Sequence, residues 1–298
     1  MKSRHLLIGC GIAAFILILF FLLILFAKII LSGKNPFASG GNVGVVEVVG
    51  MIIDSKEFIQ QLHEFRDDKR IKAVVLRIDS PGGVVGPSQE MYEEVKKFAA
   101  KKILVVSMGS LAASGGYYIA SPANKIFANP GTVTGSIGVL MKLSNIQRLL
   151  GKVGLNSFVI KSGKFKDSGS PLREMTKEDR DLLQGVIDSL HGQFVKAVAE
   201  GRKIPLKDVM QIADGRIFSG EQALEMKLVD RLGNMPDAIA EAARMAGIKG
   251  EPEVVYPPEK RKSLLNYLIE STSDRIAEKM NSETGISLRY EMSGFFPR

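Results

Sequence analysis

The sequence contains few of the residues that build disulfides and metal centres, with one cysteine and three histidines among 298 residues. A single cysteine leaves no disulfide possible within the chain, so the protein must fold by burying an apolar core. About 45% of the residues are hydrophobic, which is sufficient for such a core. The shortage of histidine and cysteine ligands also argues against a metal site, and none is predicted.

Phosphate-binding fingerprints are absent as well, since no GxGxxG opens a helix and no GxxxxGK[ST] occurs. The net charge is +8, but the densest basic cluster, residues 260–262, is short and follows Glu259. Nucleic-acid-binding proteins usually carry a dense basic stripe with interleaved aromatic residues, so no nucleic-acid partner is predicted. The modest basic excess suits a protein that lies close to anionic lipid head groups.

The first 33 residues contain no acidic residue, and Leu6 to Ala27 form a run of 22 uncharged, mostly apolar residues. A helix needs roughly 20 such residues to span a bilayer, so residues 1–30 are predicted to be a membrane anchor. A cleaved signal peptide is the alternative, although its apolar region is usually about 7 to 15 residues long. The sequence around Cys10 is similar to a lipoprotein attachment box, but the long apolar stretch follows the cysteine instead of preceding it.

The charges that flank this run slightly favour a cytoplasmic N-terminus. We therefore expect a single-pass protein of the bacterial cytoplasmic membrane, with the domain that follows the anchor on the extracytoplasmic side. Residues 31–42 are rich in Ser, Gly, Asn and Pro, which is typical of a linker. A domain over residues 43–250 and a peripheral tail over residues 251–298 should follow.

Apolar β-branched runs alternate with helical patterns along the domain, which predicts an α/β fold with a mostly parallel sheet. Runs such as residues 74–76 and 104–106 lack polar alternation, as expected of strands buried on both faces. Strands are predicted at Val43–Val49, Ala73–Ile78, Ile103–Val106, Lys125–Ala128, Val133–Leu140 and Ser157–Lys161. Helices are predicted at Lys56–Arg66, Ser88–Ala100, Lys177–Glu200, Leu206–Ala213, Gly220–Met226, Met235–Ala246 and, in the tail, Ser263–Met280.

Three glycine-rich stretches lie at or just after predicted strands: DSPGG at 79–83, AASGGYY at 112–118 and GSIG at 135–138. Ligands of parallel α/β sheets bind beyond the carboxyl ends of the strands, so chemistry is expected in these loops. Ser114 is flanked by Ala113 and Gly115, which leave room for a substrate carbonyl beside its hydroxyl. The backbone N–H that follows could then face a developing oxyanion. Glycines that merely permit tight turns are the alternative interpretation for any one loop.

A serine nucleophile needs a general base. His5 precedes the apolar run, while His63 and His191 fall in predicted helices, so none of the three is expected to serve. Lysine can act as a base when burial or nearby positive charge lowers its pKa. The segment at 161–167 offers Lys161, Lys164 and Lys166, and the last two share a face if it is extended. The spacing alone leaves this choice open.

The motifs DSPGG, AASGGYY, GSIGV and SGKFKDSGSP together resemble the signal peptide peptidase A, or protease IV, family of Ser/Lys endopeptidases, over roughly residues 43 to 250. The resemblance implies that Ser114 is the nucleophile and Lys166 the base, with the N–H groups of Gly83 and Gly115 as the oxyanion hole. It further implies the Clp protease/crotonase-like fold of stacked ββα units, no cofactor, and signal peptides as substrates.

The chain is of the family's half-length kind, which implies that Lys166 of one subunit completes the site around Ser114 of a neighbour in a homo-oligomer. Two rival functions remain open at this stage. One is acyl-CoA chemistry of the crotonase type, which uses paired oxyanion N–H groups without a serine nucleophile. The other is a catalytically silent membrane scaffold that binds peptides.

Overall fold

The computed structural model describes residues 17–24, 41–258 and 288–291, which belong to two units, Met1–Gly40 and Gly41–Arg298. Of the first unit, residues 17–24 are described and are helical. The remainder of the predicted anchor, with His5 and Cys10, lies outside the described residues. Among the helices described, none is both long and apolar enough to cross a membrane.

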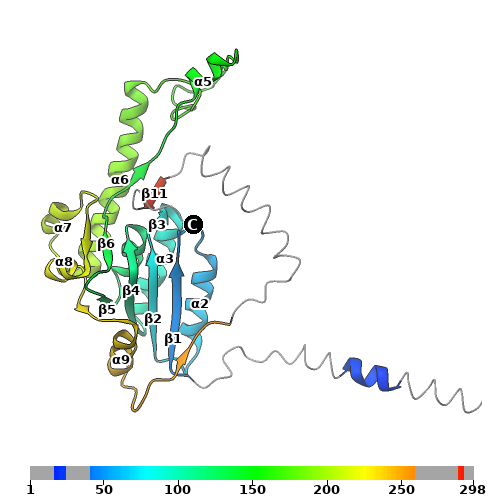
Figure 1. The fold of residues 1–298 in the computed structure, drawn as a ribbon, viewed down its shortest axis with the longest axis vertical. Coiled ribbons are helices and arrows are strands. Elements are labelled where there is room, and N and C mark those ends of the chain that lie inside the picture. The colour runs from blue at the N-terminus through cyan, green and yellow to red at the C-terminus, as the bar shows by residue number, and fades with distance from the viewer. Residues whose placement is uncertain (1–16, 25–40, 259–287, 292–298) are drawn as a thin grey trace, which may run out of the picture. The chain divides into compact units, whose positions relative to one another are not determined.

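The second unit is built around a mixed eight-stranded sheet, which confirms the predicted α/β class (Figure 1). Six strands follow the order β10-β1-β2-β4-β5-β9, with β6 beside the far part of β4 and β8 antiparallel to β6. The strand bounds are β1 Val43–Val49, β2 Ala73–Ser80, β4 Ile103–Ala113, β5 Lys125–Ala128, β6 Val133–Gly135, β8 Ile217–Ser219, β9 Arg231–Leu232 and β10 Val254–Val255.

Helices connect the strands and cover the sheet. Their bounds are α2 Lys56–Asp67, α3 Val85–Ala99, α4 Gly115–Ala120, α5 Gln147–Lys152, α6 Lys177–Arg202, α7 Leu206–Ile212, α8 Gly220–Glu225 and α9 Met235–Met245. The long helix α6 begins with a capping box, in which Asp179 N donates to Thr176 Oγ1 and Thr176 N donates to the Asp179 carboxylate. This start agrees with the sequence prediction.

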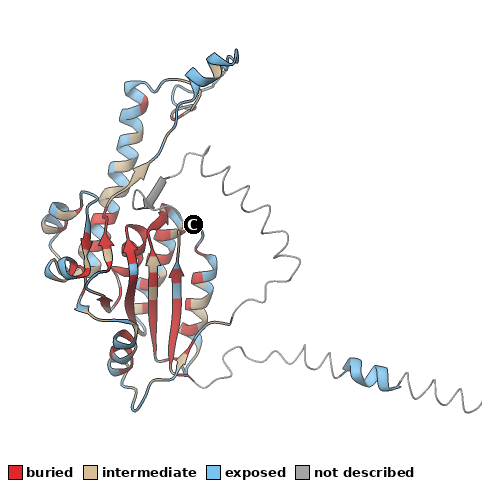
Figure 2. Ribbon diagram, in the orientation of Figure 1, coloured by how far each residue is buried: buried red, intermediate tan, exposed pale blue. Residues whose placement is uncertain are grey.

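The central strands are buried on both faces, as their continuous apolar runs require (Figure 2). On one face, Val43 and Val45 of β1 belong to a core cluster with Ala238 and Ala242 of α9. On the other, Gly44 faces the ring of Phe65 in α2, whose Cδ2 would lie 2.8 Å from a Cβ at this position. Successive residues of β1 therefore point to opposite faces of the sheet, one covered by α9 and the other by α2.

Several predicted elements are wrong. The prediction at Val133–Leu140 is broken, because β6 ends at Gly135 and a two-residue strand, β7, follows at Leu140–Met141. Residues 157–161 form no strand at all. The structure also contains α5 and several short strands that no pattern indicated, and the predicted helix Ser263–Met280 lies outside the described residues.

A second, three-stranded sheet joins parts of the chain that are distant in sequence. Its middle strand is β11, Leu288–Glu291, which pairs antiparallel with β3, Gly82–Val84, and with β7. The strand β3 follows directly after β2, so this small sheet begins at the carboxyl edge of the main sheet.

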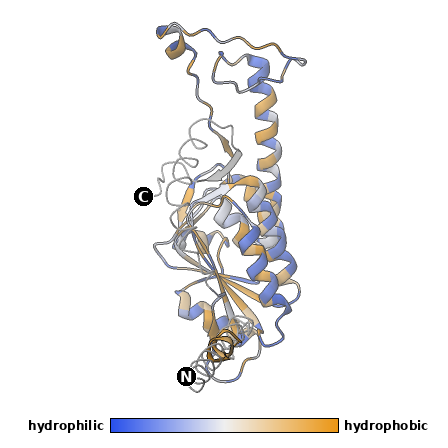
Figure 3. Ribbon diagram, turned by 90° about the vertical axis from the view of Figure 1, so that its right-hand side faces the viewer, coloured by the Kyte–Doolittle hydropathy of each residue, from blue (hydrophilic) through white to orange (hydrophobic). Residues whose placement is uncertain are grey.

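The chain between β7 and α7 forms an arm that extends beyond the same edge (Figure 1). Helix α6 carries hydrophobic and hydrophilic residues along its whole length (Figure 3). Its buried apolar residues, Phe194, Val195, Ala197 and Val198, lie in its last third, whereas Leu182 and Val186 nearer its start are exposed. The first part of α6, with α5 and the loop between them, is therefore not covered by the described part of the domain.

Candidate active site

Ser114 lies at the turn between β4 and α4, beyond the carboxyl ends of the parallel strands. Its backbone has φ 53° and ψ −115°, an unusual conformation for a residue other than glycine, and its N–H donates to Gly135 O at 2.8 Å. The residue is fully buried, and its Oγ has no hydrogen-bond partner among the described residues. A buried serine hydroxyl usually finds a partner, so this one is available for a ligand or base.

The helix that follows Ser114 is fixed by two tyrosines. Tyr117 is fully buried and its hydroxyl donates to Leu228 O at 2.9 Å. The ring of Tyr118 packs between Tyr92 of α3 and Phe194 of α6, with centroid distances of 4.7 and 4.9 Å. Burial raises the pKa of Tyr92 to about 12 and also raises the pKa of Tyr118, so both tyrosine hydroxyls stay protonated in ordinary buffers. The turn at Ser114 is thereby held between two layers of the core.

Gly83 and Gly115 bring two backbone segments into close approach beside Ser114. A Cβ at Gly115 would lie 3.1 Å from Gly83 N and 2.8 Å from Ser88 Oγ, while a Cβ at Gly83 would lie 2.0 Å from Ile52 O. Neither position can hold a side chain without displacing its neighbours. The structure thus brings Gly83 and Gly115, the two predicted oxyanion glycines, together beside Ser114.

The third glycine-rich loop supports this turn from the other side. Gly135 and Ser136 both have positive φ, 79° and 51°, and Ser136 N donates to Arg216 O at 2.8 Å. Thr134 Oγ1 donates to Ala112 O at 2.6 Å, which joins β6 to the end of β4. All three glycine-rich stretches therefore converge on one edge of the sheet, as predicted.

The strand β11 lies alongside this site. Its backbone pairs Tyr290 with Gly83 and Glu291 with Gly82, so an extended segment of the chain runs along the strand that holds a predicted oxyanion donor. On its other side Leu288 pairs with Met141 of β7. The edge of β3 therefore accepts an extended chain in antiparallel register.

The segment with the candidate lysines folds as consecutive turns and not as the extended chain in which Lys164 and Lys166 would share a face. Lys166 is exposed and its backbone N donates to Gly163 O at 3.1 Å. Lys164 lies 3.8 Å from Glu178, and Lys161 forms an ion pair with Asp167 at 2.5 Å. Since Ser114 Oγ has no partner in the described part of the chain, no one of these lysines is hydrogen-bonded to it within one chain.

A network around Arg173 holds this segment against the start of α6, and the sequence analysis missed it. The Arg173 guanidinium donates to Asp167 at 2.9 Å and to Asp179 at 2.5 Å. Ser168 Oγ donates to the other Asp179 oxygen at 2.6 Å. Two carboxylates bound by one arginine fork fix Asp167, the neighbour of Lys166. Only the capping residues Thr176 and Asp179 gave a sequence signal here.

The network stays ionised over a wide pH range. Hydrogen bonds from Arg173 and then Lys161 hold the pKa of Asp167 well below its usual range, and those from Arg173 and Ser168 do the same for Asp179. A carboxyl group whose pKa is lower in the folded chain than in the unfolded chain stabilises the fold at pH values above its unfolded pKa, which is near 4. This stabilisation is lost as the pH falls from the unfolded pKa toward the folded pKa. The segment should therefore stay ordered through the neutral and alkaline range in which a lysine base would act.

The histidines are engaged elsewhere, as expected. His63 Nε2 lies 2.5 Å from Glu94 between α2 and α3, and His191 Nε2 lies 2.7 Å from Ala213 O. Neither is bonded to Ser114, whose Oγ has no partner among the residues described.

The model of peptidase family S49 matches residues 96–249, and the Clp protease model matches residues 48–133. The first range contains Ser114, Lys166 and the Arg173 network, and the second contains Gly83 and Ser114.

The chain is also similar to individual curated proteins. It is 47% identical to a candidate protease of Synechocystis sp., over 68% of this chain and 74% of that protein. It is 37% identical to a candidate signal peptide peptidase of Enterococcus faecium, over 68% of this chain and 63% of the relative. It is 34% identical to a chloroplastic serine protease of Arabidopsis thaliana, over 72% of this chain and 33% of the relative.

Replacing Arg173 with lysine should loosen the segment that carries Lys166. A lysine cannot donate the planar fork that binds both carboxylates, so residues 161–170 should exchange amide hydrogen faster and peptide hydrolysis should fall about tenfold. Hydrogen exchange with mass spectrometry and a peptide-hydrolysis assay measure the two effects. Arg148→Lys is the matched control on the same arm, because the Arg148 side chain is 92% exposed and lies 3.5 Å from Glu174. Equal exchange in both variants would contradict the positioning role.

Proposed function

Because the chain belongs to peptidase family S49, a family of serine peptidases with a Ser/Lys dyad, we propose that Ser114 is its nucleophile and Lys166 its general base. The observation that carries this proposal is the buried Ser114 Oγ without a partner among the described residues, at the point where Gly83 and Gly115 approach each other. This environment is expected of a serine nucleophile whose general base comes from another subunit.

The proposed reaction is acyl transfer to Ser114. Neutral Lys166 takes the hydroxyl proton as Oγ attacks the peptide carbonyl, and the N–H groups of Gly83 and Gly115 donate to the oxyanion. Collapse of this intermediate breaks the C–N bond, and the lysine ammonium returns its proton to the leaving amine. Water, deprotonated by the same lysine, then releases the acyl group and regenerates Ser114.

The proposed substrates are signal peptides and similar apolar peptides. The name of the Enterococcus faecium relative and the apolar run Leu6 to Ala27 support this choice, because a membrane-anchored peptidase would meet such peptides at the bilayer. The proposal includes a single-pass anchor in a bacterial cytoplasmic membrane, an extracytoplasmic catalytic domain, and a domain of stacked ββα units of the Clp protease and crotonase kind.

The proposed active form is a homo-oligomer in which Lys166 of one subunit reaches Ser114 of the next. The arm supports this form, because apolar side chains are exposed on it in the single chain. They are Leu149 at 60%, Val153 at 64%, Leu155 at 60%, Phe158 at 88% and Ile160 at 98% exposed. A second copy would cover them and bring its own Ser114 within reach of the arm.

Substitution of either dyad residue should abolish peptide hydrolysis. Ser114→Ala and Lys166→Ala should each lower kcat by at least about a thousandfold, because the two groups act as a unit. Lys164→Ala should retain most activity, since Lys164 lies against Glu178. A fluorophosphonate probe tests Ser114 directly, and absence of labelling in the oligomer would favour an acyl-CoA enzyme or a scaffold.

A shared site makes a separate prediction. Mixtures of Ser114→Ala and Lys166→Ala subunits should regain activity, because some interfaces would combine an intact serine with an intact lysine. Hydrolysis should be measured after dissociation and reassembly, with each variant reassembled alone as the control. Absence of recovery from every mixture would place both residues in one chain or reject the dyad.

The strand β11 occupies the edge of β3 that an extended substrate would need in order to present its carbonyl to Gly83 N. Removing residues 286–298 should therefore raise kcat/KM several-fold, mainly through a lower KM. Removing residues 292–298 alone, which leaves β11 in place, should change neither constant. Equal kinetics for the two truncated chains would contradict competition at this edge.

A further inference from the structure

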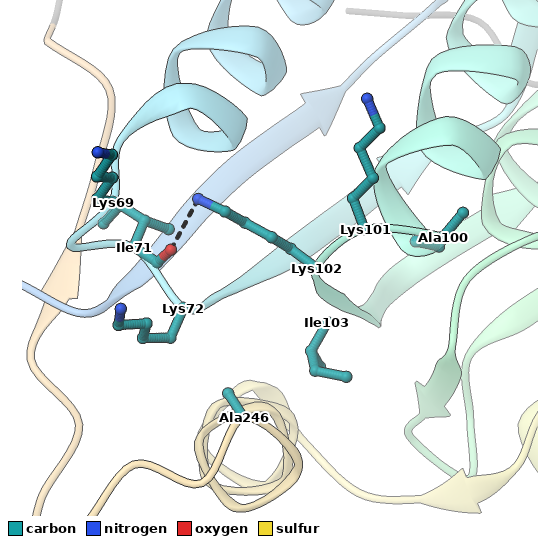
Figure 4. Close-up of a pocket in the computed structure, with 9 residues that line it drawn as sticks. Lys69, Ile71, Lys72, Ala100, Lys101, Lys102, Ile103 and Ala246 are labelled. Carbon is teal, nitrogen blue, oxygen red and sulfur yellow. Dashed lines mark hydrogen bonds between the residues drawn. The ribbon is translucent and has the colours of Figure 1, made fainter.

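A pocket of about 410 Å³ lies at the amino edge of the main sheet, opposite the edge that carries Ser114 (Figure 4). Four lysines line it: Lys69, Lys72, Lys101 and Lys102. The remaining walls are apolar, with Ile71 and Ala246 among them, and no carboxylate belongs to the lining. The pocket has no part in the chemistry proposed above.

Lys102 provides a fixed positive charge in the pocket. Its Nζ donates to the carbonyls of Phe65, Asp68 and Ile71 at 3.0, 2.7 and 2.9 Å, where α2 ends and the chain turns into β2. Figure 4 shows its side chain extended toward the loop at Ile71. Burial lowers the pKa of Lys102, and the charge of Lys72 acts in the same direction, while the carboxylates of Asp68 and Asp67 oppose this shift. Three backbone carbonyls hold this ammonium in place.

The other three lysines of the pocket lie at the protein surface. Lys69, Lys72 and Lys101 are exposed, and none of them forms an ion pair with a carboxylate of the described residues. The nearby acids are already paired, Asp67 with Arg66 at 2.9 Å and Asp68 with Arg70 at 2.7 Å. Four lysines in the lining of one pocket, with no carboxylate among the lining residues, favour binding of an anion.

The pocket lies where the N-terminal segment enters the domain. Lys72 N donates to Asn42 O at 2.9 Å, and Val43, the first residue of β1, is paired with Ala73. Residues 28–42 would join an anchor at residues 6–27 to β1, and these 15 residues can extend over at most about 54 Å, which limits how far this edge could lie from the bilayer surface. The attraction of lysines to anionic lipid acts within about 10 Å at ordinary salt, a range that such tethering makes accessible.

We propose that this pocket binds the phosphate of an anionic phospholipid head group and so seats the amino edge of the domain on the membrane. The lysine ammonium groups are point-charge donors that suit phosphate oxygens, and the apolar wall suits the glycerol part of the lipid. The inference rests on the proposed membrane anchor and is independent of the Ser/Lys dyad.

The test uses the full chain in nanodiscs of phosphatidylcholine, with or without about 30% phosphatidylglycerol, and measures acylation of each lysine by mass spectrometry. Lys69 and Lys72 should react at least about fivefold more slowly with the anionic lipid, and the protection should weaken in high salt. Lys196 and Lys207, exposed on α6 and α7, are reference lysines whose rates should not change. Equal rates at Lys69 and Lys72 in both lipids would overturn the proposal.

Two further experiments identify the source of the anion and the residues that bind it. Inorganic phosphate added to phosphatidylcholine nanodiscs should give little protection, and full protection by it would show a small-anion site instead of a lipid site. The double variant Lys69→Gln/Lys72→Gln should abolish protection of Lys101, whereas Lys196→Gln/Lys207→Gln, with the same change in charge, should preserve it. Protection that survives the first pair would also overturn the assignment.

The same samples separate failure of this proposal from failure of the others. Loss of the chain from the nanodiscs during purification would reject the anchor and, with it, the lipid site. Absence of fluorophosphonate labelling at Ser114, together with normal lysine protection, would reject the dyad while the lipid site stands.

Discussion

The close approach of backbone segments at the carboxyl edge of the main sheet is the constraint on which the site depends. A Cβ at Gly83 would lie 2.0 Å from Ile52 O, and one at Gly116 would lie 3.0 Å from Ser80 O. Because no side chain fits there, β3 and the first turn of α4 can lie side by side beneath Ser114. The unusual backbone of Ser114 is tolerated because its N–H is bonded to Gly135 and because Tyr117 fixes the following helix in the core.

The sequence predicts the sheet well where a strand is buried by its own subunit. The bounds of β1 and β5 agree with prediction, and most residues of both strands are buried. The prediction for β4 begins correctly at Ile103 but ends at Val106, whereas the strand continues to Ala113. The apolar β-branched pattern fails at Ser157–Lys161, where Phe158 and Ile160 are 88% and 98% exposed. A β-branched run indicates a surface that packs well, and it forms a strand only when a neighbouring strand is present to pair with it.

Some residues of the site can be predicted from the local sequence, whereas others depend on contacts between distant parts of the chain. The glycine-rich loops after strands indicated Ser114 and the N–H of Gly115 that follows it, because tight turns and close approach need small residues in the local sequence. The assignment of Gly83 came from the family resemblance. The role of Arg173 depends on which carboxylates the fold brings to its guanidinium, and charged residues are too common in sequence to show such pairing. The partnership of β3 with β11 joins residues about 200 positions apart, and no local pattern indicates it. The base is harder still to predict, because within one chain Ser114 Oγ has no described partner.

The amino and carboxyl edges of the main sheet differ in charge and polarity. The amino edge carries the four lysines of the pocket and the entry of the N-terminal segment, whereas the carboxyl edge carries Ser114 and an arm with exposed apolar side chains. The 11 residues of β4 connect them and span roughly 35 Å at a rise of about 3.3 Å per residue. If the amino edge is seated on lipid as proposed, a peptide could reach Ser114 only after leaving the bilayer. Such a separation would let the enzyme cleave released, extended peptides while membrane helices of intact proteins stay out of reach.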